Sequence, residues 1–404
     1  MAMDTRLPDA VARSAGTRIV FVVIDGVGGL PDPSTGLTEL EAARTPNLDA
    51  LAADAAVGLH RPVAAGITPG SGPGHLALFG YDPREWLIGR GVLSALGVGF
   101  PLRPGDLAAR LNLATVDAAG NVTDRRAGRP SDAEGRRIVG LLEGAVEAPD
   151  GLELFWRAEK EHRAVMILRG EGLSDALDDT DPQATGVPPL PVQALDPAAE
   201  ATAEAVARVL SDAHAALRGE SPANALLARG FACFERYPSM RERFGLSCLA
   251  TARYPMYQGV ARLLGMDVAD TPASEEEAVR TVAARYADAD FHFLHFKYPD
   301  SRGEDGDVAA KVAAIEAVDA LMPVLVGLEP DVLVVTGDHS TPARMRTHSW
   351  HPVPLLIASP WCRGGNAGGF GERACLAGEL GIIAATDILP LALAHAGRLE
   401  KYGA

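Results

Sequence analysis

The chain has 404 residues, of which 47% are hydrophobic and 22% are charged, and it contains 43 glycines and 29 prolines. This composition is typical of a folded globular protein and excludes the disordered and fibrous classes. The net charge of −16 argues against nucleic acid or an anionic membrane as the main partner, although local arginines or bound cations can still hold an anionic substrate.

The cysteines and the first residues bear on the cellular compartment. Cys233, Cys248, Cys362 and Cys375 form no CxxC pair, so neither a disulfide framework nor a thiolate zinc site is indicated. Residues 1–20 contain no uninterrupted apolar segment after a basic start, and no apolar run in the chain is long enough to span a bilayer. We therefore expect a cytoplasmic protein that is neither secreted nor anchored in a membrane.

The predicted elements begin with a buried strand at residues 18–25, RIVFVVID. This continuous β-branched run is of the kind that is buried on both faces of a parallel sheet. Residues 43–55 predict a helix with Thr45 as its N-cap. The glycine- and proline-rich stretch 66–83 predicts a turn and a short apolar helix that begins near Gly74. Strand, loop and helix in this order indicate an α/β fold.

The sequence pattern changes between residues 105 and 290. Asp-, Gly- and Arg-rich turns separate short strands, such as 163–170, from Ala-rich helices, such as 197–217. We interpret 105–290 as an inserted α+β domain. The core domain around it is then formed by 1–104 together with 291–404.

The α/β pattern resumes after the insertion. Strands are predicted at 291–297, 331–339 and 352–359, with a long helix at 307–327 and a final helix at 384–396. Polar residues stand at the C-terminal ends of several predicted strands. In an open α/β sheet, ligands bind at that edge.

Polar side chains from separate segments are predicted to meet there. They are Asp25, Ser71, Asp300, Glu304, Asp338 and His339, with His348 and His351 a short loop later. Carboxylates with a minority of imidazoles suit Mn²⁺, Mg²⁺ or Zn²⁺ better than a thiophilic metal. Each residue alone has a structural explanation, because an aspartate after a strand is often a turn residue or a helix cap. Their common position at the ends of successive strands favours a joint site.

A series of motifs runs in order along almost the whole chain. In the core they are VVIDGVGG, EAARTPNLDALA, GSGPGHLALFGYDP and VVTGDHSTP, the last followed by HSWHPVPLLI. In the insertion they are TVDAAGNVTDRRAGR, LRGEGLSDALDDTDP, NALLARGF and GVARLLGMDV. Together they resemble the alkaline phosphatase superfamily and, within it, the archaeal-type 2,3-bisphosphoglycerate-independent phosphoglycerate mutases.

The resemblance implies an alkaline-phosphatase-like fold, with a mostly parallel sheet flanked by helices as the metal-binding phosphotransfer core and the insertion as a substrate-binding lid. It also implies that Ser71 is the nucleophile and is transiently phosphorylated. One divalent ion would be bound by Asp25, Ser71, Asp338 and His339, and a second by Asp300, Glu304 and His348. We expect Mn²⁺, with Mg²⁺, Zn²⁺ or Co²⁺ as alternatives, since a metal-bound serine hydroxyl is more easily deprotonated.

Glu304 is a departure from the superfamily pattern. Many members have Asp-x-x-x-His where this chain reads DSRGE, from Asp300 to Glu304. A carboxylate in place of an imidazole should shift the metal preference toward harder ions. We expect Glu304 to bind the second metal. The alternatives are that it only caps a helix, or that His351 coordinates the ion in its place.

Arginines of the insertion are candidate substrate ligands. Arg125, Arg169 and Arg229 each end or follow a strand-like run with glycine close by. A guanidinium can bind a carboxylate or a phosphate in bidentate fashion, so we expect these three residues to contact the substrate. The alternative is that they are ion-pair partners of carboxylates such as Asp124 and Asp175.

The expected function is the interconversion of 3-phosphoglycerate and 2-phosphoglycerate, with this small molecule as the partner and neither nucleic acid nor membrane. A mutase must keep glycerate bound and exclude water while phosphoserine exists, which gives the insertion a purpose. The alternative is a metal-dependent phosphohydrolase or a mutase of another phosphorylated metabolite. A catalytically silent metal-binding protein is a third hypothesis, and the oligomeric state stays open.

Overall fold

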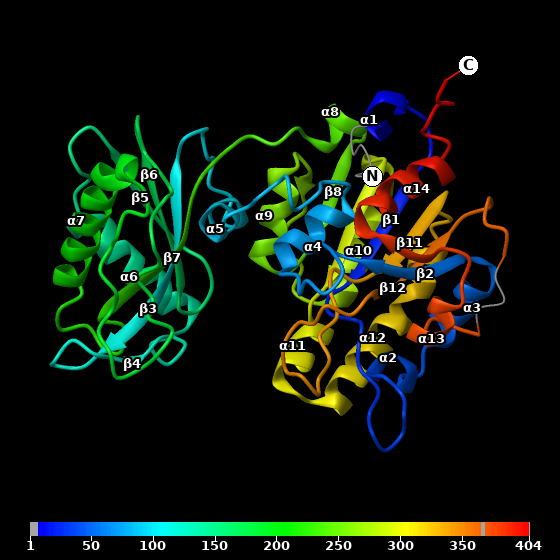
Figure 1. Cartoon of the computed structure of the whole chain (residues 1–404), viewed down its shortest axis with the longest axis horizontal. Helices are drawn as coiled ribbons and strands as arrows, with labels where there is room; N and C mark the ends of the chain where they lie inside the picture. The colour runs from blue at the N-terminus through cyan, green and yellow to red at the C-terminus, as the bar shows by residue number, and fades with distance from the viewer. Residues whose placement is uncertain (1–6, 365–367, 404) are drawn as a thin grey trace. The chain divides into compact units, whose positions relative to one another are not determined.

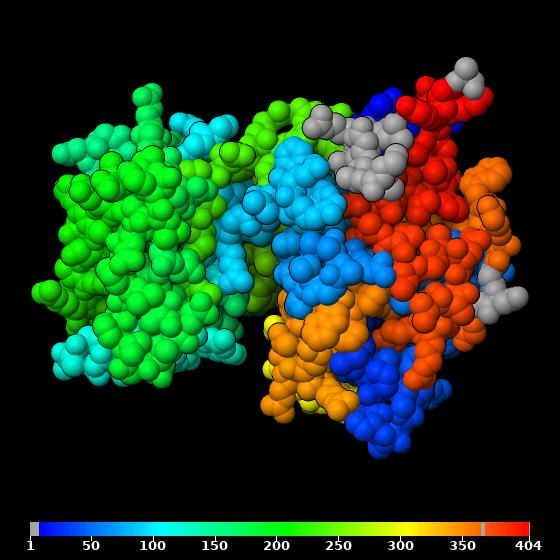
Figure 2. All heavy atoms as spheres, viewed as in Figure 1, coloured from blue at the N-terminus to red at the C-terminus, as the bar shows by residue number. Residues whose placement is uncertain are grey.

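The computed structural model describes residues 7–364 and 368–403 and contains two compact units (Figure 1). Unit 1 comprises Met1–Leu87 and Pro238–Ala404, and unit 2 comprises Ile88–Tyr237. Unit 2 runs from cyan to green in Figure 1 and Figure 2. Figure 2 shows all heavy atoms of both units from the same side as Figure 1. Residues 88–237 therefore form a compact unit of their own.

The sequence pattern places the insertion at 105–290, whereas unit 2 begins at Ile88 and ends at Tyr237. Helix α5 (Arg90–Gly97) packs on the sheet of unit 2, where a Cβ on Gly91 would lie only 2.1 Å from the Ala108 carbonyl oxygen. Strand β8 (Cys248–Thr251) pairs in parallel with β10 (Phe291–Phe296) and so extends the sheet of unit 1. The chain thus enters and leaves unit 2 earlier than the sequence pattern indicated.

Unit 1 is built on an eight-stranded sheet in the order β13-β2-β12-β11-β1-β10-β8-β9. Strand β1 (Ile19–Ile24) lies between β10 and β11 (Val332–Thr336) and pairs with both in parallel. Strand β12 (Val353–Ala358) is antiparallel to β11 and to β2 (Ala56–Arg61). The two edge strands are β9 (Asp267–Val268) and β13 (Gly381–Ala384). The expected mostly parallel sheet is confirmed.

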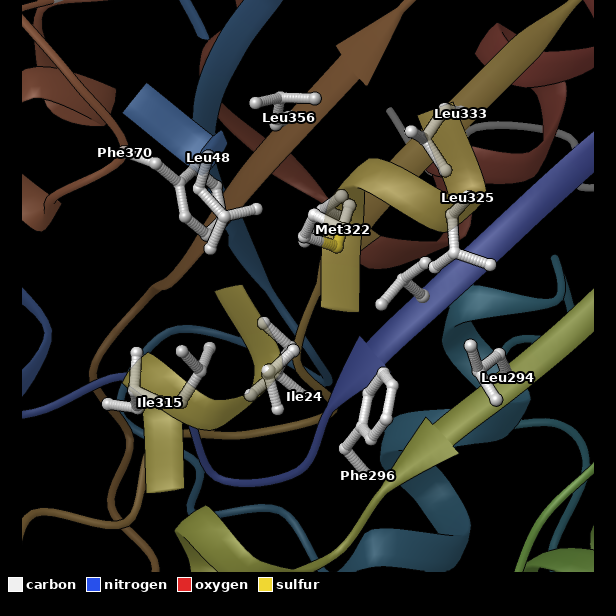
Figure 3. Close-up of a cluster of buried hydrophobic side chains, with 14 of the residues drawn as sticks. Ile24, Leu48, Leu294, Phe296, Ile315, Met322, Leu325, Leu333, Leu356 and Phe370 are labelled. Carbon is white, nitrogen blue, oxygen red and sulfur yellow. The ribbon is translucent and has the colours of Figure 1, made fainter. Parts of the chain in front are cut away.

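Helices cover both faces of this sheet. On one face the main hydrophobic cluster joins Ile24 and Leu294 of the strands to Met322 and other side chains of the helices (Figure 3). The longer helices on this face are α3 (Pro46–Asp54), α10 (Glu275–Ala284) and α12 (Val308–Val326). The opposite face carries Phe21, whose ring lies 6.5 Å from that of Phe79 at the end of α4 (Ser71–Leu78). Burial on both faces explains why the central strands are continuous apolar runs.

The remaining helices of unit 1 are short or flank this framework. They are α1 (Leu7–Val11), α2 (Glu39–Ala42), α8 (Met240–Phe244), α9 (Pro255–Leu263), α11 (Tyr298–Asp305), α13 (Glu372–Leu376) and α14 (Ile388–His395). Asp307 separates α11 from α12 and caps the latter, because its side chain accepts a 2.9 Å hydrogen bond from the amide of Ala310. Within the described part of the chain, no helix is long and apolar enough to cross a membrane.

Unit 2 is an α+β structure, as expected. Its sheet consists of β3 (Leu107–Val116), β4 (Val122–Asp124), β5 (Glu153–Ala158), β6 (Arg163–Arg169) and β7 (Ala225–Cys233). Strand β3 pairs in antiparallel fashion with β4, β6 and β7. Two helices, α6 (Asp132–Ala145) and α7 (Glu200–Ala216), bury their apolar sides against one face of the sheet. Unit 2 therefore has a hydrophobic core of its own.

Candidate active site

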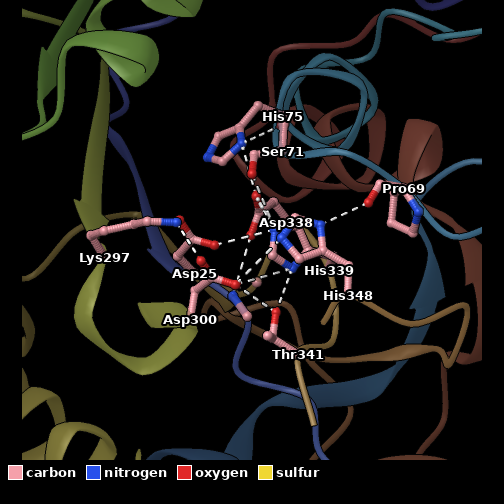
Figure 4. Close-up of polar contacts among 12 residues, drawn as sticks. Asp25, Pro69, Ser71, His75, Lys297, Asp300, Asp338, His339, Thr341 and His348 are labelled. Carbon is pink, nitrogen blue, oxygen red and sulfur yellow. Dashed lines mark hydrogen bonds and ion pairs between the residues drawn. The ribbon is translucent and has the colours of Figure 1, made fainter. Parts of the chain in front are cut away.

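Four of the residues predicted at the sheet edge come together at the ends of three neighbouring parallel strands (Figure 4). Asp25 follows β1, Asp300 lies in the first turn of α11 after β10, and Asp338 and His339 follow β11. All four side chains are fully buried. The carboxyl edge of this α/β sheet is thus the location of the candidate site, as the sequence predicted.

Two groups of potential metal ligands share His339. Asp25, Asp338 and His339 form the first group, and Asp300, His339 and His348 form the second, with the ligand atoms of each group within 4.8 Å of one another. His339 Nε2 lies 3.3 Å from Asp25 Oδ1 and 3.2 Å from Asp338 Oδ2. His348 Nε2 lies 3.6 Å from Asp300 Oδ1. The rings of His339 and His348 are stacked, with centroids 3.6 Å apart.

The donor atoms of these groups fit divalent metal ions. Asp25 Oδ1 and Asp338 Oδ2 are buried and accept no hydrogen bond from the described residues. Their neighbours are imidazole nitrogens at 3.2 to 3.3 Å, and a bound cation would stabilise these buried carboxylate oxygens further. Carboxylates combined with imidazoles are suitable ligands for Mg²⁺, Mn²⁺ and Zn²⁺.

Ser71 lies beside the first group as the first residue of α4. The helix begins there and not near Gly74, the start that the sequence suggested. Ser71 Oγ lies 3.2 Å from His339 Nε2. The helix N-terminus carries partial positive charge, which favours an anion next to the hydroxyl. Gly74 permits this close packing, because a Cβ at that position would lie 2.5 Å from the Asp338 carbonyl oxygen.

Three further side chains contact Asp25. The Tyr257 hydroxyl donates a short hydrogen bond to Asp25 Oδ2, Lys297 Nζ donates a 3.0 Å bond to the same oxygen, and His295 Nε2 lies 3.2 Å from it. Burial alone would raise the pKa of Asp25, but Lys297 and the neighbouring imidazoles outweigh burial and hold that pKa well below its ordinary value. Sequence reasoning missed Tyr257, which is 232 positions from Asp25 and gives no local signal. Lys297 also pairs with Asp300.

Glu304 lies outside both ligand groups in this structure. Its carboxylate is 3.8 Å from His348 Nε2, and its side chain is 55% exposed. Burial of the carboxyl group and the nearby charge of Asp300 raise the pKa of Glu304. His351 also belongs to neither ligand group. Its Nδ1 lies 3.0 Å from Ser349 Oγ. The second group therefore rests on three residues, with Glu304 at its margin.

Two of the three predicted arginines share a partner in unit 2. Arg125 binds Asp181 in bidentate fashion, with Nε–Oδ1 and Nη2–Oδ2 distances of 2.8 and 2.7 Å. Arg229 Nη1 lies 3.4 Å from the same Oδ2. Arg169 instead forms a bidentate pair with Asp106, at 2.8 and 2.7 Å. The structure thus brings Arg125 and Arg229 together and gives Arg169 a different carboxylate.

Comparison with known proteins identifies the family. A family profile described as 2,3-bisphosphoglycerate-independent phosphoglycerate mutase matches residues 52–224. A Thermus thermophilus protein named as a probable 2,3-bisphosphoglycerate-independent phosphoglycerate mutase is 48% identical over 400 residues, which are 98% of this chain and 98% of that protein. The chain belongs to the 2,3-bisphosphoglycerate-independent phosphoglycerate mutase family. It is accordingly an enzyme of that family.

Other known proteins are similar over nearly the whole chain. An Aquifex aeolicus protein with the same name is 48% identical over 402 residues, again 98% of each chain. The structure of a cofactor-independent phosphoglycerate mutase from Thermoplasma acidophilum matches with a TM-score of 0.71 and 28% identity, covering 94% of this chain and all of that one. A Pyrococcus horikoshii protein structure matches with a TM-score of 0.82 and 30% identity, covering 98% of this chain and 100% of that chain.

Proposed function

We propose that this member of the mutase family interconverts 3-phosphoglycerate and 2-phosphoglycerate through a phosphoserine at Ser71. The observation that carries the proposal is the 3.2 Å distance between Ser71 Oγ and Nε2 of His339, the residue common to both ligand groups. The relatives' names support the substrate class. The four cysteines are all free, in keeping with the cytoplasmic location that we also propose.

Ser71 would act first as nucleophile and later as leaving group. Its Oγ loses its proton and forms a bond to phosphorus while the bond from phosphorus to O3 of 3-phosphoglycerate breaks, and the glycerate O3 gains a proton in exchange. After the glycerate reorients, its 2-hydroxyl attacks the phosphoserine, loses its proton and releases Ser71. The N-terminus of α4 favours the negative charge of the phosphoryl group throughout.

We propose Mn²⁺ as the metal at both positions, because it accepts carboxylate and imidazole ligands together. The first ion would be held by Asp25, Ser71, Asp338 and His339, and the second by Asp300, Glu304 and His348. Divalent ions bound there would lower the pKa of the serine hydroxyl and balance the charge of the transferred phosphoryl group.

Unit 2 is proposed as the substrate-binding lid, with Arg125 and Arg229 as contacts to the anionic groups of the substrate. Both guanidinium groups converge on Asp181, whose side chain is fully buried, so they are held in fixed orientations. Arg169 stays a prediction from the arginine and glycine pattern of the insertion. Its bidentate pair with Asp106 gives it a structural role in unit 2.

Phosphorus NMR tests the proposal directly. The Mn²⁺-loaded protein is incubated with 3-phosphoglycerate, and Ser71→Ala serves as the control. We expect 2-phosphoglycerate to appear without free phosphate, and we expect Ser71→Ala to form none. Release of free phosphate would instead identify a phosphohydrolase. No conversion with Mn²⁺, Mg²⁺, Zn²⁺ or Co²⁺ would contradict both enzymatic hypotheses.

A further inference from the structure

Tyr257 joins helix α9 to the first group of potential metal ligands within unit 1. Its hydroxyl donates a short hydrogen bond to Asp25 Oδ2, and both side chains are fully buried. Tyr257 lies in the first turn of α9, whereas Asp25 follows β1. A buried tyrosine hydroxyl usually has a hydrogen-bond partner, but here the partner is a carboxylate whose orientation decides how it can bind an ion.

Aromatic packing fixes the ring of Tyr257. The ring is stacked on the imidazole of His295 in β10, with centroids 3.6 Å apart and an angle of 25° between the planes. The imidazole of His75 in α4 lies 4.9 Å from the same ring. His75 also contacts the first ligand group, because its Nδ1 lies 3.3 Å from Asp338 Oδ2. Close-packed neighbours therefore hold the Tyr257 hydroxyl in one position beside Asp25.

The two carboxylate oxygens of Asp25 have different surroundings. Oδ2 accepts the hydrogen bond from Tyr257 and a 3.0 Å bond from Lys297 Nζ, and it lies 3.2 Å from His295 Nε2 (Figure 4). Oδ1 accepts no hydrogen bond from the described residues and lies 3.3 Å from His339 Nε2. One oxygen is therefore occupied by side chains, and the other is left facing the first ligand group.

We propose that Tyr257 is a positioning residue for the first metal ion, because it holds Asp25 Oδ2 and so presents Oδ1 to an ion shared with Asp338 and His339. The inference deepens the proposed function and rests on its metal site. Side chains that hydrogen-bond a metal-binding carboxylate orient it, and their loss typically lowers metal affinity about ten- to a hundredfold. Asp25 belongs to the first ligand group and not to the second, so the effect should be confined to one ion.

The test measures metal binding separately from turnover. Metal-free, full-length protein is titrated calorimetrically with Mn²⁺, with and without Tyr257→Phe, which keeps the ring stacked on His295 and removes only the hydroxyl. We expect one of two Mn²⁺ ions to bind about ten- to a hundredfold more weakly and the other to stay within about twofold. Tyr81→Phe is the matched control. It also removes the hydroxyl of a fully buried tyrosine, which donates a 2.6 Å hydrogen bond to the Pro238 carbonyl oxygen, and it should leave both affinities unchanged.

A spectroscopic measurement on the parent keeps the test open if Tyr257→Phe fails to fold. An ion on Asp25 Oδ1 weakens the carboxylate as a hydrogen-bond acceptor, so the near-ultraviolet absorbance of tyrosine should change with one Mn²⁺ binding event and not with the other. Unchanged Mn²⁺ affinities in Tyr257→Phe, equal weakening in Tyr81→Phe, or an absorbance that responds to neither ion would each overturn the inference. An active mutase in the NMR test, combined with any of these results, would leave the proposed function intact and remove only the role of Tyr257.

Discussion

The ammonium group of Lys311 donates a 2.8 Å hydrogen bond to the carbonyl oxygen of Thr341. It donates a second, 3.0 Å bond to the carbonyl oxygen of Gly28, and the whole side chain is buried on α12. Gly28 lies in the turn that follows Asp25, and Thr341 lies two residues after His339. One buried cation thus links the backbones of the two loops that carry ligands of the first metal group.

Replacing this cation should destabilise the protein. We expect Lys311→Met to lower the free energy of unfolding by about 2–4 kcal/mol, because two buried carbonyl groups lose their donor. Urea unfolding measures the change, and Lys401→Met, at an exposed lysine, should lie within about 0.5 kcal/mol of the parent. A loss for Lys311→Met as small as that of the control would show that the two loops hold their positions without it.

Glu304 can be tested as a metal ligand. We expect Glu304→Gln to weaken the binding of one of two Mn²⁺ ions by about ten- to a hundredfold and to leave the other unchanged, as for loss of an outer or marginal ligand. Calorimetric titration of the metal-free protein with Mn²⁺ resolves the two events. Asp305→Asn is a matched control, because Asp305 is on the same helix, is 61% exposed and pairs with Arg302. Identical titrations for Glu304→Gln and the parent would leave the second ion to Asp300, His339 and His348.

Two glycine substitutions should have opposite effects on stability. The added Cβ of Gly74→Ala would meet the backbone oxygen of Asp338 at 2.5 Å, so we expect a loss of about 1–3 kcal/mol and weaker Mn²⁺ binding. Gly140 lies on the exposed side of α6 with open space at its Cβ position. We expect Gly140→Ala to raise the free energy of unfolding by about 0.5–1 kcal/mol through better helix propensity. Urea unfolding compares the two, and losses of equal size would contradict the steric explanation.

His60 should make the stability depend on pH. It is fully buried on β2 with Nε2 3.0 Å from the carbonyl oxygen of Gly337, and burial lowers the pKa of His60 from 6.5 to about 4. As the pH falls from 6.5 to 4, His60 binds a proton in the unfolded chain before it does so in the folded protein. The free energy of unfolding should therefore fall from pH 6.5 to pH 4, by up to about 3 kcal/mol from this residue.

The contribution of His60 is isolated by comparison with a variant that cannot titrate. Urea unfolding of the parent and of His60→Gln is followed between pH 4 and 7. The parent should lose stability more steeply than His60→Gln on acidification. Parallel curves for the two proteins would mean that His60 is protonated equally in the folded and unfolded states.

The sequence predicts this site well where each functional residue follows a strongly patterned strand. Asp25, Asp300, Asp338 and His339 follow β1, β10 and β11, and topology alone places those strand ends together. The partners that arrive from elsewhere in the chain could not be predicted. Tyr257 reaches Asp25 across 232 positions, and no local pattern connects the two.

The boundaries of unit 2 could not be predicted for a different reason. The apolar spacing of α5 indicates a helix that packs on something, but it does not say on which sheet. Likewise, β8 is a short apolar strand that would suit either sheet, and only its pairing with β10 assigns it to unit 1.

Strand β12 runs against β11, and this reversal has a consequence for the second group of potential metal ligands. If β12 were parallel to β11, the chain would have to cross from the C-terminal end of β11 to the opposite end of the sheet. The antiparallel connection instead stays at the end of the sheet where β11 finishes. His348 is carried on that connection and is stacked against His339. Insertions, deletions or substitutions in this single connection can therefore alter the second ligand group without shifting the register of any strand.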